Sequence, residues 1–189
     1  IAENSNRHRP IGLGFANLGS LLMLMGIPYD SDQGRAWAGM ITAMMTAQCY
    51  FTSSEIARIK TPFAEYSKNK KSALAVLAKQ MNSVHEIDWS QLPEQYKQAT
   101  YALWMKAVTH VKKHGLRNSQ VTVIAPTGTI GLVMDCGTTG IEPDYSLVKN
   151  KKLSGGGQLR IVNESLQNVL KNLQYSDSDI NQIIHHIVN

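Results

Sequence analysis

The sequence is poor in cysteine, with only Cys49 and Cys136 among its 189 residues. The two lie far apart and form no C-x-x-C pair, which argues against a disulfide framework and against a zinc knuckle. So few cysteines are typical of a protein of the reducing cytoplasm. We therefore expect a cytoplasmic protein in which neither cysteine binds a metal.

The sequence also lacks an apolar run suited to a membrane. The segment from 11 to 27 follows Arg7 and Arg9 and imitates a signal peptide, but Pro10 and several glycines interrupt it and no Ala-x-Ala site follows. It is short for a membrane span and contains the polar Asn17. We predict a buried helix here and no membrane partner.

Long basic runs are missing as well, although lysine and arginine outnumber the acidic residues by 19 to 14. The lysines stand in short clusters without interleaved aromatic residues, a pattern that favours a solvated surface over a nucleic-acid-binding stripe. With 43% hydrophobic and 17% charged residues, the chain is globular. A basic helical module that binds nucleic acid stays open as an alternative.

Helical spacing of apolar residues dominates the first 115 positions. Capping residues and prolines predict helices at about 33–60, ended by Pro62, at 68–80, and from Pro93 to Gly115. The first of these has an apolar stripe consisting of Trp37, Met40, Ile41, Met44, Phe51 and Ile59. In the earlier segment the stripe of small residues should let a neighbouring backbone approach closely: Gly12, Ala16 and Gly19.

Two later regions complete the outline. A strand is predicted near 146–148, then a basic mobile loop through Gly155 to Gly157, and then two closing helices at 163–172 and 176–188. His110 and His114 have the spacing of a helical metal pair, but no third ligand accompanies them, so we predict no metal site.

The segment from Val121 to Asp144 points most directly to a function. Its first four residues form a β-branched block typical of a strand covered on both faces, and Pro126 ends that strand. Small residues and hydroxyls follow it: Thr127, Gly128, Thr129 and Gly131. Their backbone N–H groups can converge on a phosphate, although an ordinary strand–turn has the same composition.

Three separated motifs, taken together, resemble the large catalytic subunit of ribonucleotide reductases, most closely the adenosylcobalamin-dependent class II enzymes. They are RHRPIGLGFANLGSLLMLMG from Arg7, HGLRNS at 114–119 with APTGTIG at 125–131, and TTGIEPD at 138–144. VKNKKLSGGG and the closing helices are similar to the class II continuation. The resemblance thus spans nearly the whole chain.

The resemblance implies an α/β fold: a helix-rich portion of the family's ten-stranded α/β barrel, with a few mostly parallel strands. Residues 1–189 would be one partial domain, the C-terminal part of the catalytic barrel. Residues 1–115 would be mainly helical, 116–160 would hold strands and the phosphate loop, and 161–189 the closing helices. The implied phosphate-binding residues are Pro126, Thr127, Gly128, Thr129 and Ile130, with Gly131 and Glu142 as secondary candidates.

The family reduces ribonucleotides to 2′-deoxyribonucleotides by radical chemistry, with a thiyl cysteine in an Asn-x-Cys-x-Glu setting. Neither Cys49 nor Cys136 has that setting, so we expect no catalytic residue in this chain and no activity from it alone. Adenosylcobalamin would bind outside it. Glu142 and Asp144 stay open as acid–base partners, with ordinary turn chemistry as the alternative.

The partners implied are the ribonucleotide substrate, the remainder of the reductase chain, a thioredoxin-type reductant and a second copy in a homodimer. Gly128 and Ile130 favour class II, because class I enzymes tend to have serine- or alanine-rich residues here. A class I large-subunit fragment, with a radical-generating partner subunit in place of cobalamin, remains the alternative.

Overall fold

The chain divides into two compact units in a computed structural model that describes residues 1–152, 155–163 and 165–188. Unit 1 consists of residues 1–14 and 35–124, and unit 2 of residues 15–34 and 125–189. Both units draw on two separate stretches of sequence. They therefore do not coincide with the three consecutive blocks expected from the sequence.

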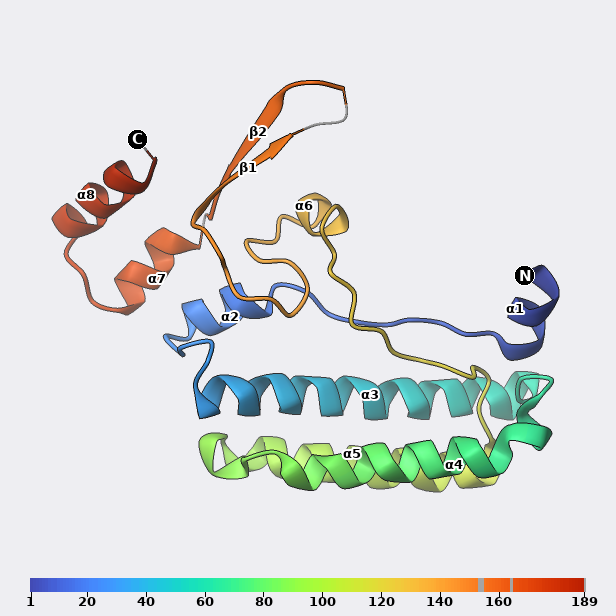
Figure 1. Cartoon of the computed structure of the whole chain (residues 1–189). Coiled ribbons are helices and arrows are strands. Elements are labelled where there is room, and N and C mark those ends of the chain that lie inside the picture. Colours follow the sequence, from blue (N-terminus) through green and yellow to red (C-terminus); the bar gives the residue numbers. More distant parts are fainter. Residues whose placement is uncertain (153–154, 164, 189) are drawn as a thin grey trace. The chain divides into compact units, whose positions relative to one another are not determined.

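Helices make up most of the regular structure (Figure 1). The helices are α1 (Ala2–His8), α2 (Leu18–Leu24), α3 (Asp32–Lys60), α4 (Tyr66–Ser83), α5 (Glu94–His114), α6 (Ile130–Val133), α7 (Leu166–Asn172) and α8 (Asp177–Val188), with 3-10 turns η1 (Val84–Glu86) and η2 (Trp89–Gln91). The described strands are β1 (Val148–Lys152) and β2 (Gln158–Val162).

The three long helices of unit 1 confirm the sequence prediction closely. At the start of α3 the Ser31 hydroxyl accepts the Gly34 N–H at 3.0 Å, as expected of a capping residue. Pro93 precedes α5, and Gly115 ends it with a positive φ of 76°. The helices α3, α4 and α5 share one core, whose most buried members are Ala47, Leu77, Trp104, Ala107 and Val111.

The predicted apolar stripe of α3 is correct except at its end. Met40 is 3% exposed and Phe51 packs against the core, but Ile59 is 68% exposed. At about 100° per residue, the eight positions from Phe51 to Ile59 turn the side chain roughly 80° away from the core-facing direction. A stripe drawn by spacing alone overlooks this rotation.

The predicted helix over residues 11–17 is wrong, because this stretch is extended and α2 begins only at Leu18. Leu13 forms a parallel bridge with Thr122, donating its N–H to Val121 O at 3.0 Å and accepting the Val123 N–H at 2.9 Å. A Cβ at Gly14 would lie 2.5 Å from Val123 O. The small residues do admit a close backbone, as predicted, but the two segments pair as extended chains.

The strand predicted at 121–124 is covered less than expected. Val121 is 2% exposed, whereas Val123 and Ile124 are 39% and 71% exposed. A strand buried on both faces needs neighbours on both sides, and among the described residues the single bridge to Leu13 is its strand pairing. The two-face burial predicted from the β-branched block is therefore not present here.

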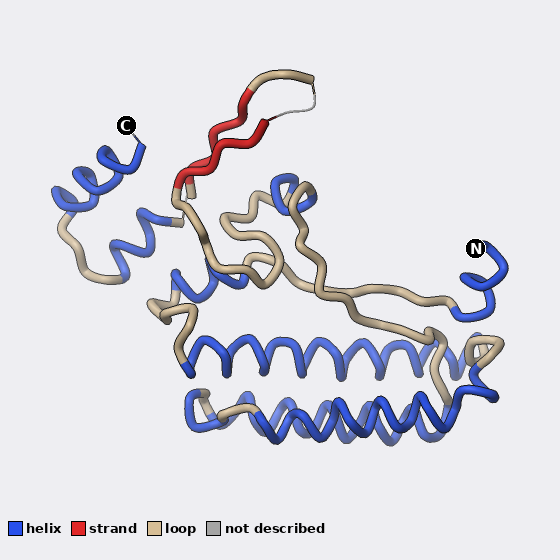
Figure 2. Tube along the Cα trace, in the orientation of Figure 1, coloured by secondary structure: helices blue, strands red, loops and turns tan. Residues whose placement is uncertain are grey.

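The strand pairing also differs from the mostly parallel arrangement that was expected. Strands β1 and β2 form an antiparallel hairpin with Val148 opposite Val162 and Lys152 opposite Gln158 (Figure 2). The basic residues from Lys149 to Lys152, predicted as a loop, lie in β1. Positions 153 and 154 of the predicted loop lie outside the described residues, within which no closed barrel is formed.

The closing helices of unit 2 confirm the prediction. Leu166, Leu170 and Ile180 are buried together, and Asn172 Nδ2 donates to Leu24 O of α2 at 2.9 Å.

Over the parts of the chain that the structure describes, no helix combines the length and the apolar character needed to cross a membrane.

Glu65, the residue before α4, links α1 to α4 within unit 1. Arg7 Nε donates to Glu65 Oε1 at 3.0 Å, and Lys68 Nζ lies 3.0 Å from Oε2. These two cations, with the Arg7 hydrogen bond the larger cause, lower the pKa of Glu65 from 4.5 to about 2. A lowered carboxyl pKa stabilises the fold above the unfolded value, and that stability is lost as the pH falls from about 4.5 toward 2.

We therefore expect Arg7→Gln to raise the Glu65 pKa part of the way toward 4.5, because Lys68 remains, and to reduce the loss of stability between about pH 4.5 and 2. Carboxyl carbon shifts followed by NMR measure the pKa directly. Lys97→Gln is the matched control, because its ammonium lies 4.0 Å from the exposed Glu94. An unchanged Glu65 pKa in Arg7→Gln would contradict the assignment.

Candidate phosphate-binding site

The predicted phosphate loop is an exposed turn of unit 2 that leads into the short helix α6. Thr127 has a positive φ of 53°, and its carbonyl accepts the Gly131 N–H at 2.7 Å. Thr129 O accepts the Leu132 N–H at 3.2 Å. These bonds fold the chain back on itself so that the residues between Thr127 and Gly131 form the outside of the turn.

Consecutive backbone N–H groups on this turn are left without partners. Across residues 1–152, 155–163 and 165–188, nothing accepts a hydrogen bond from the N–H of Gly128, Thr129 or Ile130. All three residues are exposed, and a Cβ added to Gly128 would meet no atom within 4 Å. Adjacent, unpartnered N–H groups on exposed residues are a backbone arrangement that can bind anions.

The back of the loop is closed by Gly140. Its N–H donates to Thr127 Oγ1 at 2.7 Å, and a Cβ on it would lie 2.7 Å from Ala125 O. Gly140 also has a positive φ of 51°, which residues with a side chain rarely adopt. The loop and the Thr138–Gly140 segment are therefore in direct backbone contact.

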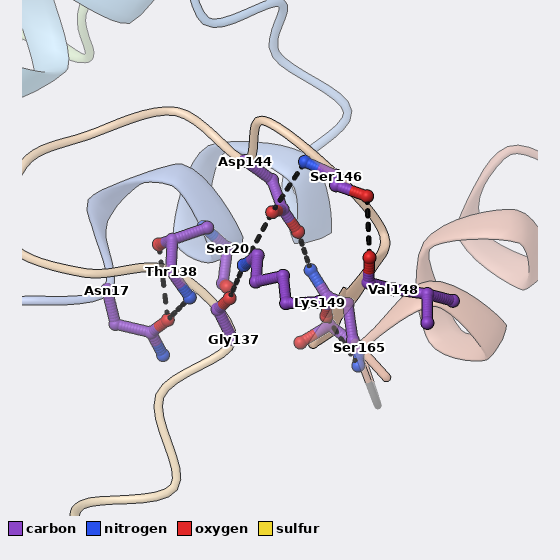
Figure 3. A network of polar contacts seen from close by, with 10 residues as sticks. Asn17, Ser20, Gly137, Thr138, Asp144, Ser146, Val148, Lys149 and Ser165 are labelled. Carbon is purple, nitrogen blue, oxygen red and sulfur yellow. Dashed lines mark hydrogen bonds and ion pairs between the residues drawn. The ribbon is translucent and has the colours of Figure 1, made fainter. Parts of the chain in front are cut away.

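The segment behind the loop is anchored to the start of α2, as Figure 3 shows. Asn17 Oδ1 accepts the Thr138 N–H at 3.0 Å and lies 3.4 Å from Thr138 Oγ1. That hydroxyl accepts the Ser20 N–H at 3.1 Å. Thr138 and Ser20 are each 1% exposed, so this anchor is dry and its hydrogen bonds are shielded from water.

Asp144 belongs to a second polar cluster in the same figure. Its side chain is 4% exposed, and Lys149 Nζ lies 2.6 Å from Oδ1 while Asn163 Nδ2 donates to Oδ2 at 2.6 Å. Lys149 also donates to Gly137 O at 2.7 Å. Both carboxylate oxygens are therefore occupied by neighbouring groups, an arrangement that suits support of the chain better than proton transfer.

The other predicted site residues lie as follows. Pro126 and Ile130 are exposed on the loop, and Gly131 is buried beneath it. Glu142 is exposed in a turn in which its N–H donates to Thr139 O at 3.0 Å, the turn geometry that was the alternative to an acid–base role. Its side chain is not held by the network that anchors Thr138.

The two cysteines are placed differently. Cys136 is half-buried and donates its N–H to Gly131 O at 2.9 Å, so it adjoins the loop. Cys49 is buried in α3 of unit 1, and that burial raises the pKa of its thiol. A neutral thiol enclosed in a helix bundle is a packing residue.

Asn17, Thr138 and Gly140 were not predicted as site residues from the sequence. Asn17 has a positive φ of 69°, a conformation that asparagine tolerates better than most residues. Its residue type was therefore the available signal. Thr138 and Gly140 stood in the TTGIEPD motif, but nothing in the sequence shows that they lie behind the loop.

His110 and His114 lie on α5 in unit 1, away from these groups in the sequence. His110 Nδ1 lies 3.0 Å from Ser54 Oγ, and its Nε2 contacts Glu55 Oε1. Burial, together with nearby positive charge from His110 and Lys113, lowers the pKa of His114. Within the described ranges, no three His, Cys, Asp or Glu side chains are grouped to hold a metal.

A family model described as the ribonucleotide reductase barrel domain matches residues 1–189. The chain belongs to this ribonucleotide reductase family. The vitamin B12-dependent ribonucleotide reductase of Agrobacterium fabrum is 46% identical over 198 residues, covering 97% of this chain and 16% of that protein. The protein of the same description from Streptomyces coelicolor is 45% identical over 188 residues, with 99% of this chain and 19% of that protein covered.

A more distant member of the ribonucleotide reductase family is also similar. The ribonucleoside-diphosphate reductase large subunit of Caenorhabditis elegans is 27% identical over 187 residues, which is 97% of this chain and 22% of that protein. The chain thus spans between 16% and 22% of the length of these three relatives.

Proposed function

We propose that this chain is part of a longer, B12-dependent ribonucleotide reductase and that residues 126–130 hold the phosphates of the ribonucleotide substrate. The observation that carries the site is the row of unpartnered N–H groups at Gly128, Thr129 and Ile130. A di- or triphosphate offers several anionic oxygens to such a row, and charge-assisted hydrogen bonds are the strong ones.

The resemblance to B12-dependent enzymes favours class II over class I. Identity is 45% and 46% to two vitamin B12-dependent reductases and 27% to the large subunit from Caenorhabditis elegans. The class I alternative is therefore not favoured, and a cobalamin-dependence assay on the longer protein separates the two. A nucleic-acid-binding module is not favoured either, since the family model spans residues 1–189.

The chemistry of this reductase belongs to other residues. Adenosylcobalamin supplies a radical when bound, but Cys49 is buried in a helix bundle and Cys136 is half-buried behind the loop, so neither fits a radical-bearing cysteine. We therefore assign the cofactor and the catalytic cysteines to the rest of the reductase. This chain binds and orients the phosphates, and alone it is inactive.

The proposal also includes the barrel to which this chain contributes, the partners of the reductase and its compartment. Leu13 and Thr122 form a parallel bridge, and the extended segments around them would continue into the family's ten-stranded barrel through neighbours supplied by the remainder of the chain. The partners are a ribonucleotide, a thioredoxin-type reductant and a second copy of the reductase, in the cytoplasm.

The site is tested by charge at Gly128. In the isotopically labelled chain, inorganic pyrophosphate should shift the backbone amide resonances of residues 128–130. Gly128→Asp should weaken binding at least tenfold, since a carboxylate near several phosphate charges costs on the order of 1 kcal/mol for each charge even in water.

Gly128→Asn is the matched control, because it has the same shape without the charge. The open space around Gly128 accommodates either side chain. Equal affinities of the Asp and Asn variants, or shifts confined to other residues, would show that pyrophosphate does not bind at this loop.

A further inference from the structure

We propose that Asn17 is a positioning residue for the phosphate loop, acting through Thr138, Gly140 and Thr127. We call these four residues, Asn17, Thr138, Gly140 and Thr127, the Asn17 latch. The inference rests on the proposed function of the loop and adds a residue that lies more than a hundred positions away in the sequence. Asn17 does not touch the phosphate; it determines where the N–H groups that bind the phosphate are held.

The first step of the latch joins α2 to the segment behind the loop. Asn17 Oδ1 accepts the Thr138 N–H at 3.0 Å, and Thr138 Oγ1 accepts the Ser20 N–H at 3.1 Å. Figure 3 shows the amide of Asn17 directed at Thr138. Because Thr138 is 1% exposed, water cannot replace these bonds without opening the structure.

The second step joins that segment to the loop. Two residues after Thr138, the Gly140 N–H donates to Thr127 Oγ1 at 2.7 Å. Thr127 is the residue whose positive φ of 53° turns the chain so that Gly128, Thr129 and Ile130 face outward. A non-glycine residue keeps such a backbone angle only where surrounding contacts impose it.

The opposite side of the segment is held as well. Tyr29 Oη donates to Ile141 O at 2.7 Å, and a Cβ on Gly19 would lie 2.8 Å from Glu142 O. The residues of α2 and of the turn after it therefore contact residues 138–142 at several points, and Asn17 makes the contact at Thr138. The geometry therefore makes Asn17 the start of a short chain of contacts that ends at the phosphate-binding N–H groups.

The test removes one latch bond at a time. Asn17→Gly deletes the side-chain amide while permitting the positive φ of 69°. We expect pyrophosphate to bind the full 189-residue chain about fivefold more weakly, the equivalent of one hydrogen bond. Thr138→Val should have a similar effect because it removes the hydroxyl but keeps the shape, whereas Thr138→Ser retains the hydroxyl and should bind within about twofold of the original.

Kinetics on the longer reductase separate positioning from general stability. A misplaced loop should raise KM for the ribonucleotide while kcat stays within about twofold. A purely structural role predicts losses that follow the melting temperature and affect Thr138→Ser and Thr138→Val alike, and that result would overturn the inference.

Two failures are distinguishable. If pyrophosphate does not shift residues 128–130 in the unmodified chain, the proposed function of the loop is wrong and the inference falls with it. If the unmodified chain binds pyrophosphate and Asn17→Gly binds it equally well, the loop is a phosphate site but Asn17 does not position it.

Discussion

Replacing Lys149 with methionine is expected to lower the free energy of unfolding by about 3 kcal/mol, although Lys149 lies outside the phosphate loop. The reason is the carboxylate left behind. The Asp144 side chain is 4% exposed, and among the described residues it would keep only the Asn163 amide and a long contact from the Ser146 N–H at 3.4 Å. Removing one partner of a buried ion pair destabilises a protein by more than the intact pair stabilises it, because the remaining charge stays buried without a counter-ion. Urea denaturation of Lys149→Met and of the unmodified chain measures the difference.

A double-mutant cycle shows whether the loss belongs to the pair. Asp144→Asn alone should cost about 2 kcal/mol, because it leaves the Lys149 ammonium, 15% exposed, facing a neutral amide. The double variant contains neither charge, so its loss should fall below the sum of the two by about 1–3 kcal/mol. Strict additivity would contradict a coupled ion pair.

Lys152→Met on the same strand provides the matched control. Lys152 is exposed at the end of β1, so its replacement should change stability by no more than about 0.5 kcal/mol.

The double-mutant cycle of Asp144 and Lys149 also tests whether Asp144, in the TTGIEPD motif, acts as an acid or base. If Asp144 were an acid or base, Asp144→Asn would abolish turnover of the longer reductase, and Lys149→Met could not restore it. We expect turnover to follow folding instead.

The long helices could be predicted from the sequence because their signals are local. Pro62, Pro93 and Gly115 mark helix ends by their own backbone restrictions, and each acts within a few residues of itself. The exposed N–H groups of the loop could also be predicted from the sequence, since Gly128 beside threonine residues is a local pattern. These features do not depend on what lies across the fold.

The failures arose where a distant partner decides the conformation. Residues 11–17 carry apolar and small residues at helical spacing, yet Leu13 is extended because Thr122 lies beside it. The same pattern of small residues permits a packed helix or a close extended pair, and only the neighbour selects one. The role of Asn17 was hidden for the same reason, since Thr138 is separated from it by 121 positions.

Replacing Gly140 with alanine is expected to weaken pyrophosphate binding about 30-fold and to lower the free energy of unfolding by about 2 kcal/mol. Two costs coincide at this residue. The positive φ of 51° is unfavourable for alanine, and its Cβ would lie 2.7 Å from Ala125 O, a backbone atom that cannot move without moving the loop. Displaced N–H groups lose charge-assisted hydrogen bonds worth about 1.5–3 kcal/mol each, so the 30-fold loss, about 2 kcal/mol, corresponds to roughly one such bond.

Gly128→Ala is the control that isolates this effect, since it adds the same methyl group to the same loop. Its Cβ meets nothing within 4 Å, and its N–H remains in place, so affinity should stay within about twofold. Calorimetric titration with pyrophosphate gives both affinities, and melting curves give both stabilities. If the two alanine variants bind equally well, the contact between Gly140 and Ala125 does not govern the loop. A selective loss in Gly140→Ala would instead show that the phosphate site depends on backbone contacts behind it as much as on the residues that face the ligand.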